Sequence, residues 1–302
     1  MTAGAVEIVE YTDPLCPWSW GAEPVLRALR AAVAGRVRWR RVHGVLFDDT
    51  DDPAPDAAAE TAWYARYVRD ITGHTHAPMA SALSRVAASS WPASLVAKAA
   101  ERQGTEVGER VLRRLRETVF VLGEPADTTA LALAAARGVP GLDAERLAAD
   151  AASADVRDLV RADHAEARRP VPEVLSVPPG DSPHPGAAKE TPEGGHRYAL
   201  PTLLVRSPAG VRAVPGWRTY EEYVTVIGAV LPGLPPAPVR TEAAEALGLH
   251  RSLTEPERRL LAHGVWPPSG AVRVETGNGP LWLSAEEAVT HPAVRSGSPT
   301  AP

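Results

Sequence analysis

The chain is poor in cysteine: Cys16 is the only one among 302 residues. A single thiol cannot form an intramolecular disulfide, and this usage is typical of a reducing compartment, so we expect a cytoplasmic protein. The sequence has no basic segment followed by an apolar one near its start, so no secretory signal is expected. A run of 18 apolar residues is also absent, so we expect no contact with a membrane.

Positive charge and ligand-binding motifs are scarce as well. The net charge of -5 and the pI near 6.0 argue against a nucleic-acid partner. His74 and His76 have no further partners at zinc spacing, so we expect no metal site. The sequence has no glycine-rich phosphate-binding motif, and we therefore expect no nucleotide and no tightly bound cofactor.

The cysteine lies in the stretch DPLCPWSW, residues 13–20. Residues 5–11 alternate apolar and polar side chains, which predicts a strand, whereas residues 23–33 have apolar side chains at helical spacing. Cys16 is therefore expected where a strand ends and a helix begins, with Pro17 in the first helical turn. The helix N-terminus would favour the thiolate and lower the thiol pKa below the roughly 8.5 of a free cysteine. The alternative is a buried cysteine that serves as a small hydrophobic side chain.

Strands are predicted near both ends of a long helical region. Residues 36–42 predict a second strand, which completes a βαβ unit with a parallel strand pair. Residues 199–205 and 211–214 predict a β-hairpin, and residues 219–231 predict the helix that follows it. We expect the strand at 203–205 to share a sheet with the first strand.

Residues from about 56 to 169 predict an all-helical subdomain inserted between these halves of the sheet. The expected helices are 57–70, 92–102, 106–120, 128–137, 143–152 and 154–167. Three arginines in the third of these helices predict a solvated face: Arg113, Arg114 and Arg116. Residues from about 170 to 197 are rich in Pro and Gly and predict a long irregular loop.

The last segment, residues 239–302, predicts a small separate module. Residues 241–249 and 255–263 predict two short helices, and residues 271–283 predict a β-hairpin with a Gly-Asn-Gly turn. This order resembles a winged-helix module of the α+β class. The segment carries six Arg and seven Glu, however, whereas a DNA-binding module would normally be basic. We therefore expect it to have a packing or protein-binding role.

Three features together resemble the DsbA-like (FrnE-type) branch of the thioredoxin superfamily. The stretch DPLCPWSW is similar to that family's D-x-x-C-P-W-C-W/Y run, and Leu200-Pro201-Thr202 resembles the V-P-T in which the family keeps a cis proline. The helical insertion is the third feature. The resemblance covers about residues 5–231 and implies an α/β, thioredoxin-like fold with an inserted all-helical subdomain over residues 1–234, followed by the module at 239–302.

The resemblance also implies where the chemistry takes place. In this family the reactive cysteine, here Cys16, lies beside the backbone edge set by the cis proline, where a substrate segment can pair. The two tryptophans flanking the sulfur could line a site for an apolar or planar ligand, although one of them is expected in the core. The residues that the resemblance assigns to substrate binding are Pro17, Trp18, Trp20, Leu200, Pro201 and Thr202. His43 follows the second strand and is interpreted as structural.

The chain departs from the family at Ser19, where the family has its second cysteine. In a dithiol enzyme the second thiol resolves the mixed disulfide formed by the first. Neither Ser19 nor any other residue of this chain can do so, which leaves monothiol chemistry at Cys16 with an outside thiol as co-substrate. Such a co-substrate could be a low-molecular-weight thiol. Ser19 could donate a hydrogen bond to the thiolate, or could simply be a polar residue at a helix start.

Three functions remain open on the sequence alone. The first is a monothiol DsbA-family oxidoreductase that acts on mixed disulfides of small thiols or proteins. The second is an enzyme similar to kappa-class glutathione transferases or hydroxychromene carboxylate isomerases, which share the fold and have a Ser-Pro-Tyr-Ser-like run at this place. The third is a non-catalytic adaptor that binds another protein on a thioredoxin-like scaffold.

Overall fold

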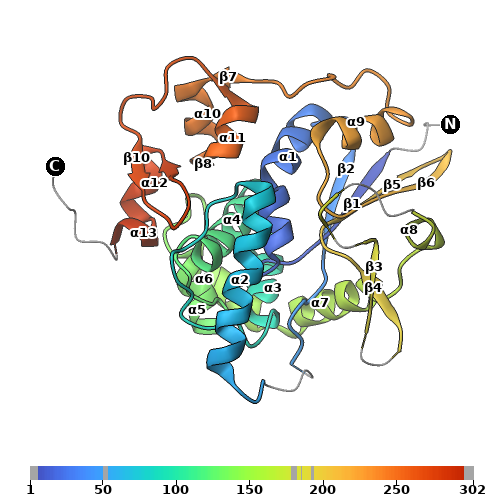
Figure 1. The fold of residues 1–302 in the computed structure, drawn as a ribbon, viewed down its shortest axis with the longest axis horizontal. Coiled ribbons are helices and arrows are strands. Elements are labelled where there is room, and N and C mark those ends of the chain that lie inside the picture. Colours follow the sequence, from blue (N-terminus) through green and yellow to red (C-terminus); the bar gives the residue numbers. More distant parts are fainter. Residues whose placement is uncertain (1–5, 50–53, 178–181, 185, 192–193, 296–302) are drawn as a thin grey trace. The chain divides into compact units, whose positions relative to one another are not determined.

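In the computed structural model the chain forms two compact units (Figure 1). Unit 1 consists of residues 1–44 and 161–239, and unit 2 consists of residues 45–160 and 240–302. The residues described are 6–49, 54–177, 182–184, 186–191 and 194–295. This division groups the C-terminal segment with the helical insertion, whereas the sequence predicted a separate module at 239–302.

Unit 1 contains a mixed four-stranded sheet in the order β2-β1-β5-β6. Its strands are β1 (Glu7–Thr12), β2 (Arg38–His43), β5 (Thr202–Ser207) and β6 (Gly210–Pro215). β1 and β2 are parallel, whereas β5 is antiparallel to both of its neighbours, β1 and β6. The predicted sheet is confirmed, because Ile8 pairs with Val205 and Glu10 pairs with Leu203.

Two helices of unit 1 pack against each other, α1 (Pro17–Val33) and α9 (Tyr220–Gly228). α1 makes the crossover from β1 to β2, as the βαβ pattern predicted. α9 begins with a capping box in which the Thr219 hydroxyl accepts from the Glu222 N–H and the Glu222 carboxylate accepts from the Thr219 N–H. Fully buried apolar side chains from the strands and α1 form the core of the unit: Ile8, Val9, Leu26, Leu29, Leu203 and Leu204.

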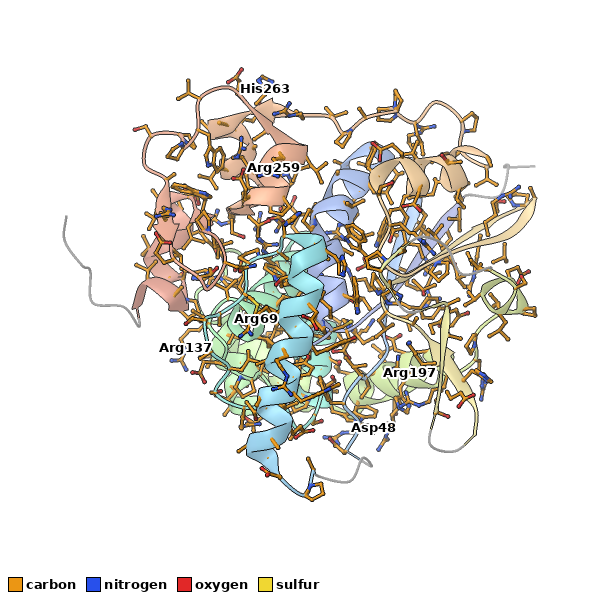
Figure 2. All side chains as sticks on the ribbon, viewed as in Figure 1. Asp48, Arg69, Arg137, Arg197, Arg259 and His263 are labelled. Atoms are coloured by element: carbon orange, nitrogen blue, oxygen red, sulfur yellow. The ribbon has the colours of Figure 1, made fainter. Side chains whose placement is uncertain are left out.

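The segment 170–197 contains more regular structure than the expected irregular loop. Its described part includes the short helix α8 (Pro172–Leu175) and the strand β3 (Ala188–Glu190). β3 pairs antiparallel with β4 (His196–Tyr198), whose middle residue, Arg197, is labelled in Figure 2. Composition rich in Pro and Gly did not reveal this hairpin, because three-residue strands leave almost no alternating pattern. Residues 178–181, 185 and 192–193 of the expected loop lie outside the described residues.

Unit 2 contains the helical insertion, and the predicted helices are present. They are α2 (Ala57–Thr75), α3 (Trp91–Glu101), α4 (Thr105–Phe120), α5 (Thr129–Ala136), α6 (Ala144–Ala152) and α7 (Ala154–Ala167), the last of which continues into unit 1. α2, α5 and α6 begin at residues whose side chains accept backbone N–H groups of the first turn: Asp56, Thr128 and Asp143. These side chains satisfy backbone donors that a helix start leaves without an intrahelical partner.

The C-terminal segment of unit 2 has the expected helices and hairpin, and also further short elements. They are β7 (Thr241–Glu242), α10 (Ala243–His250), β8 (Ser252–Thr254), α11 (Glu255–Leu261), β9 (Ala262–His263), β10 (Val272–Val274), β11 (Leu281–Leu283), α12 (Ala285–Thr290) and α13 (Pro292–Arg295). The hairpin strands β10 and β11 are antiparallel, and β8 joins them to give the order β10-β11-β8. The winged-helix resemblance stays a prediction.

The arginines of α4 correct the prediction of a solvated face. Arg113, Arg114 and Arg116 are not a solvated face, because their side chains are almost completely buried. The Arg113 guanidinium donates to both carboxylate oxygens of Glu257 on α11, over 2.8 and 2.9 Å. Arg114 Nε donates to Glu287 on α12 over 2.6 Å. The C-terminal segment is therefore joined to the helical insertion by buried ion pairs.

A glutamate on α4 completes this group, which we call the α4 cluster: Arg113, Arg114, Glu117, Ser252, Glu257, Glu287 and His291. Glu117 accepts hydrogen bonds from Arg113 Nε and the Ser252 hydroxyl, each over 2.6 Å, and its second oxygen lies 3.0 Å from His291 Nε2. Burial alone would raise the pKa of Glu117, but the Arg113 charge and these hydrogen bonds hold it well below its usual range. The helical pattern places Arg113 and Arg114 on α4, but their partners in the C-terminal segment lie more than 130 residues further along the chain.

No helix within the described part of the chain is both long and apolar enough to cross a membrane.

Candidate functional site

Cys16 lies where the sequence placed it, between the end of β1 and the start of α1. It is the N-cap residue of α1, its backbone is extended, and Pro17 follows at the first helical position. Its carbonyl accepts the first bond of the helix from the Trp20 N–H over 3.0 Å. The turn before it is held by Asp13, whose side chain accepts the Leu15 N–H over 2.7 Å. The local geometry thus agrees with the strand–Cys–Pro–helix pattern.

The order of the strands brings residues 200–202 to the same place. β5 pairs with β1 so that Thr202 lies opposite Tyr11, just before the cysteine turn. The Leu200–Pro201 peptide bond is cis. The Cys16 thiol donates to the Leu200 carbonyl oxygen over a distance of 3.6 Å from the sulfur. Residues almost 200 positions apart in the sequence therefore meet at the sulfur.

The protonation of Cys16 differs from the prediction. Burial raises the pKa of the thiol, because only 3% of the residue is exposed, and the negative charge of Asp13 adds to this effect. The Ser19 hydroxyl and the backbone N–H groups of Trp18 and Ser19 do lower the pKa, as expected for a helix start, but burial outweighs them. The sequence showed the helix terminus but not the degree of burial, so the predicted net direction was wrong.

Ser19 is the third residue of α1 and is fully buried. Its hydroxyl makes no hydrogen bond of standard geometry with any described residue, yet it lies near enough to Cys16 to favour the thiolate. The role of Ser19 as a donor to the sulfur stays a prediction.

The other predicted site residues fall into two groups. Pro17, Trp18, Leu200, Pro201 and Thr202 surround the turn at Cys16 and the start of β5, and all are buried. Trp20 is 2% exposed and is one of the largest buried side chains, as expected for the tryptophan that belongs to the core. The role of these residues in substrate binding stays a prediction.

The sequence analysis missed His184, which lies between two prolines in the segment expected to be irregular. Its ring is 5.0 Å from the Trp18 ring in an edge-to-face arrangement. Its Nε2 atom lies 3.0 Å from the Leu200 carbonyl oxygen, the same oxygen that accepts the Cys16 thiol. Burial lowers the pKa of His184 to about 4, so the imidazole is neutral at neutral pH. A lone histidine in a Pro-rich segment carries no signal that could have identified it.

His43 is also buried, and its backbone N–H donates to the Asp163 carboxylate over 3.1 Å. Within the residues that the structure describes, no group of three or more His, Cys, Asp or Glu side chains is placed to hold a metal ion.

Comparison with known proteins identifies the family. The family model described as thioredoxin matches residues 10–169, which include the Cys16 turn and the helical insertion. A candidate protein disulfide isomerase from Nitrosomonas europaea has a similar structure, with a TM-score of 0.58 and 15% sequence identity over 76% of this chain and 98% of that chain. A candidate DsbA oxidoreductase from Streptomyces coelicolor gives a TM-score of 0.52 and 18% identity over 79% of this chain and 96% of that chain.

Two relatives from sequence comparison are named ClpXP adapter protein SpxH. The protein from Shouchella clausii is 33% identical over 148 residues, which are 48% of this chain and 47% of the relative. The protein from Halalkalibacterium halodurans is 30% identical over 171 residues, 52% of this chain and 53% of the relative. The chain thus spans about half the length of the curated relatives it matches. The family match over more than half of the chain shows that the protein belongs to the thioredoxin family.

Proposed function

We propose that the protein carries out thiol–disulfide exchange through the single thiol of Cys16. The observation that carries this proposal is the position of the sulfur, at the N-terminus of α1 and 3.6 Å from the Leu200 carbonyl oxygen. A disulfide bound along the backbone at Leu200–Pro201 would present a sulfur atom to the thiolate. The DsbA-like fold supports this chemistry.

The exchange takes place in two steps and needs no oxidant. In the first step Cys16 loses its proton, and the thiolate attacks one sulfur of a disulfide R–S–S–R′, so that a Cys16–S–S–R bond forms and R′–S⁻ leaves. In the second step the thiolate of an outside thiol attacks the R sulfur and releases Cys16 as thiolate. One disulfide is broken and one is formed overall. The outside thiol is required because the chain has no second cysteine, and a reducing, cytoplasmic compartment would supply it.

Burial of Cys16 sets the pH dependence of the first step. Because burial raises the pKa of the thiol, the neutral form predominates at neutral pH and the thiolate fraction increases as the pH rises. We expect slow adduct formation at pH 7 and faster formation at pH 9.

The test is intact-mass analysis of the native protein incubated with glutathione disulfide, which serves as the probe. The wild-type chain should gain the mass of one glutathione, and an added thiol reductant should remove it. The C16S variant should gain nothing and should retain the wild-type circular dichroism spectrum. If native protein forms no adduct at pH 9 while urea-unfolded protein does, Cys16 is not an exchange centre.

A second candidate function is that of an adaptor that presents another protein to the ClpXP protease. The relatives named ClpXP adapter proteins favour it, as does the buried, neutral state of the thiol. The measurement is binding of the chain to purified ClpX. Adaptor function predicts equal binding by wild type and C16S, and an absence of binding would contradict it.

A further inference from the structure

We propose that His184 is a positioning residue for Cys16: its imidazole holds the Leu200 carbonyl oxygen hydrogen-bonded, so that the thiol can lose its proton without leaving that oxygen unpaired. The inference rests on the proposed function only in treating Cys16 as the reacting group. It concerns the ionisation of the thiol and can be tested without any exchange reaction.

The Leu200 carbonyl oxygen has two donors. The Leu200 oxygen lies 3.6 Å from Cys16 Sγ and 3.0 Å from His184 Nε2. A carbonyl oxygen has two lone pairs and can accept both donors. Leu200 is 4% exposed, so its oxygen depends on donors from the protein. When Cys16 becomes a thiolate or a mixed disulfide, the S–H donor is lost and the imidazole remains.

The surroundings of the His184 ring decide which of its nitrogens carries the proton. Nδ1 lies 3.1 Å from the Gly186 carbonyl oxygen, so both ring nitrogens face an acceptor. A neutral imidazole has one N–H and can donate to only one of them. Gly186 is exposed and its oxygen can accept from water, whereas the Leu200 oxygen is buried. The favoured tautomer therefore carries its proton on Nε2 and donates to Leu200.

Burial, with a smaller contribution from neighbouring positive charges, keeps the His184 ring neutral. Burial lowers the pKa of His184 to about 4, and the positive charges of Lys189 and Arg218 act in the same direction. On the Cys16 side, the charge that acts on the thiol is that of Asp13, which raises the pKa of the thiol. The imidazole therefore serves as a neutral donor and holds the Leu200 carbonyl without a change in its own charge.

Ser182 and Gly216 fix the position of the His184 ring. The Ser182 hydroxyl accepts the His184 N–H over 3.2 Å and donates to the Trp217 carbonyl over 2.7 Å. Gly216, with φ of +80°, lies against the ring so closely that a Cβ atom there would be 2.7 Å from Nδ1. Its N–H also donates to the Pro201 carbonyl over 2.7 Å. Only glycine at this position allows both the backbone conformation and the approach of the imidazole.

The test compares the rate of Cys16 alkylation by iodoacetamide, at pH values from 7 to 11, in four proteins. They are wild type, H184L, which removes the donor, H184Q, which retains an N–H donor, and H196L, a matched control at an exposed histidine on β4. The limiting alkylation rate at high pH reports access of the reagent to Cys16, and the midpoint of the pH profile reports ionisation of the thiol. Circular dichroism and thermal unfolding check the fold of each variant.

We expect the pKa of Cys16 to rise by about one unit in H184L, which slows alkylation about tenfold at a fixed pH below that pKa. H184Q should stay within about twofold of the wild-type rate, because an amide donor satisfies the same oxygen. H196L should be unchanged. An unshifted profile in folded H184L would overturn the proposal, and so would a H184Q protein as slow as H184L.

A second variant keeps the proposal testable if H184L does not fold. G216A retains the imidazole but displaces it from the Leu200 oxygen, so its profile should shift in the same direction as that of H184L. A wild-type profile in folded G216A would overturn the proposal. A shifted profile combined with no glutathione adduct would leave the positioning role intact and would contradict only the exchange function.

Discussion

The Cys16 site and the α4 cluster are both buried, but the polar groups of the α4 cluster are paired charges, whereas the thiol of Cys16 is neutral. In the α4 cluster each charged group has a partner of opposite charge, and the Arg113–Glu257 pair is bidentate. At Cys16 the thiol has one long contact to a carbonyl oxygen, and burial holds it neutral. Burial stabilises a charge where partners surround it and suppresses a charge where they do not. The first arrangement joins one part of the chain to another, whereas the second keeps the thiol protonated.

The largest effect that we expect is at the Cys16 site, from S19C. Residues 16 and 19 are the N-cap and the third residue of α1, so the variant would have the family's C-P-W-C spacing. An intramolecular thiol resolves a mixed disulfide far faster than a thiol from solution, so multiple-turnover insulin reduction should increase at least about a hundredfold. The control is the C16S/S19C double variant, which keeps one thiol and should stay inactive. A folded S19C protein without turnover would contradict the assignment of Cys16.

The next largest effect should come from breaking the α4 cluster with E257A. This variant leaves Arg113 buried without its bidentate partner, which costs about 3–5 kcal/mol of unfolding free energy. The matched control is E106A on α4, the helix that carries Arg113. The ion pair of Glu106 with Arg110 is more exposed to solvent, and its loss should cost no more than about 0.5 kcal/mol. Urea denaturation measures both. Equal losses in the two variants would show that burial does not distinguish these pairs.

Acid should weaken unit 2 through Glu117. Its pKa in the folded state lies below the unfolded value, so its contribution to stability is complete above about pH 4.3 and is lost as the pH falls further. The loss is about 1.4 kcal/mol for each unit by which the two pKa values differ. E117Q should therefore change less in stability between pH 6 and pH 3 than the wild type does. The exposed control E145Q should show the same dependence of stability on pH as the wild type. If E117Q also loses as much stability as the wild type between pH 6 and pH 3, Glu117 is not the source of the acid sensitivity.

The smallest effect that we expect comes from removing the capping threonine of one helix in each unit. Thr219 and Thr254 cap their helices with the same hydrogen bonds, but Glu257 in the second box is buried and also holds Arg113, whereas Glu222 in the first is half exposed. T219A should cost about 0.5–1 kcal/mol and T254A about 1–2 kcal/mol of unfolding free energy. Thermal unfolding of both variants measures the difference. A larger loss in T219A would be inconsistent with the role of the α4 cluster as the fastening of the C-terminal segment.

Local sequence patterns were sufficient for much of the fold. The alternation in residues 5–11, the periodicity of residues 57–167 and the capping residues Asp56, Thr128 and Asp143 determine which segments are strands or helices. These signals act between neighbours in the chain, so they can be read without knowing the tertiary contacts. The Cys16 turn and its approach to Leu200–Pro201 followed from the motif and from the order of the strands.

Other features depended on contacts between residues far apart in the sequence. The arginines of α4 resemble a solvated face on a helical wheel, and only partners from the C-terminal segment make their burial tolerable. His184 shows no sequence pattern, and only the tertiary structure places its Nε2 atom 3.0 Å from the Leu200 carbonyl oxygen.

The sequence by itself determined that the protein has one thiol, that this thiol starts a helix after a strand, and that no second cysteine can resolve its adducts. The tertiary structure decided how deeply that thiol is buried, which donors share its carbonyl partner, and which segment the arginines of α4 bind. The physical reason is that helix and strand formation depend on nearby residues, whereas the desolvation that sets the pKa of Cys16 and Glu117 depends on everything packed around them.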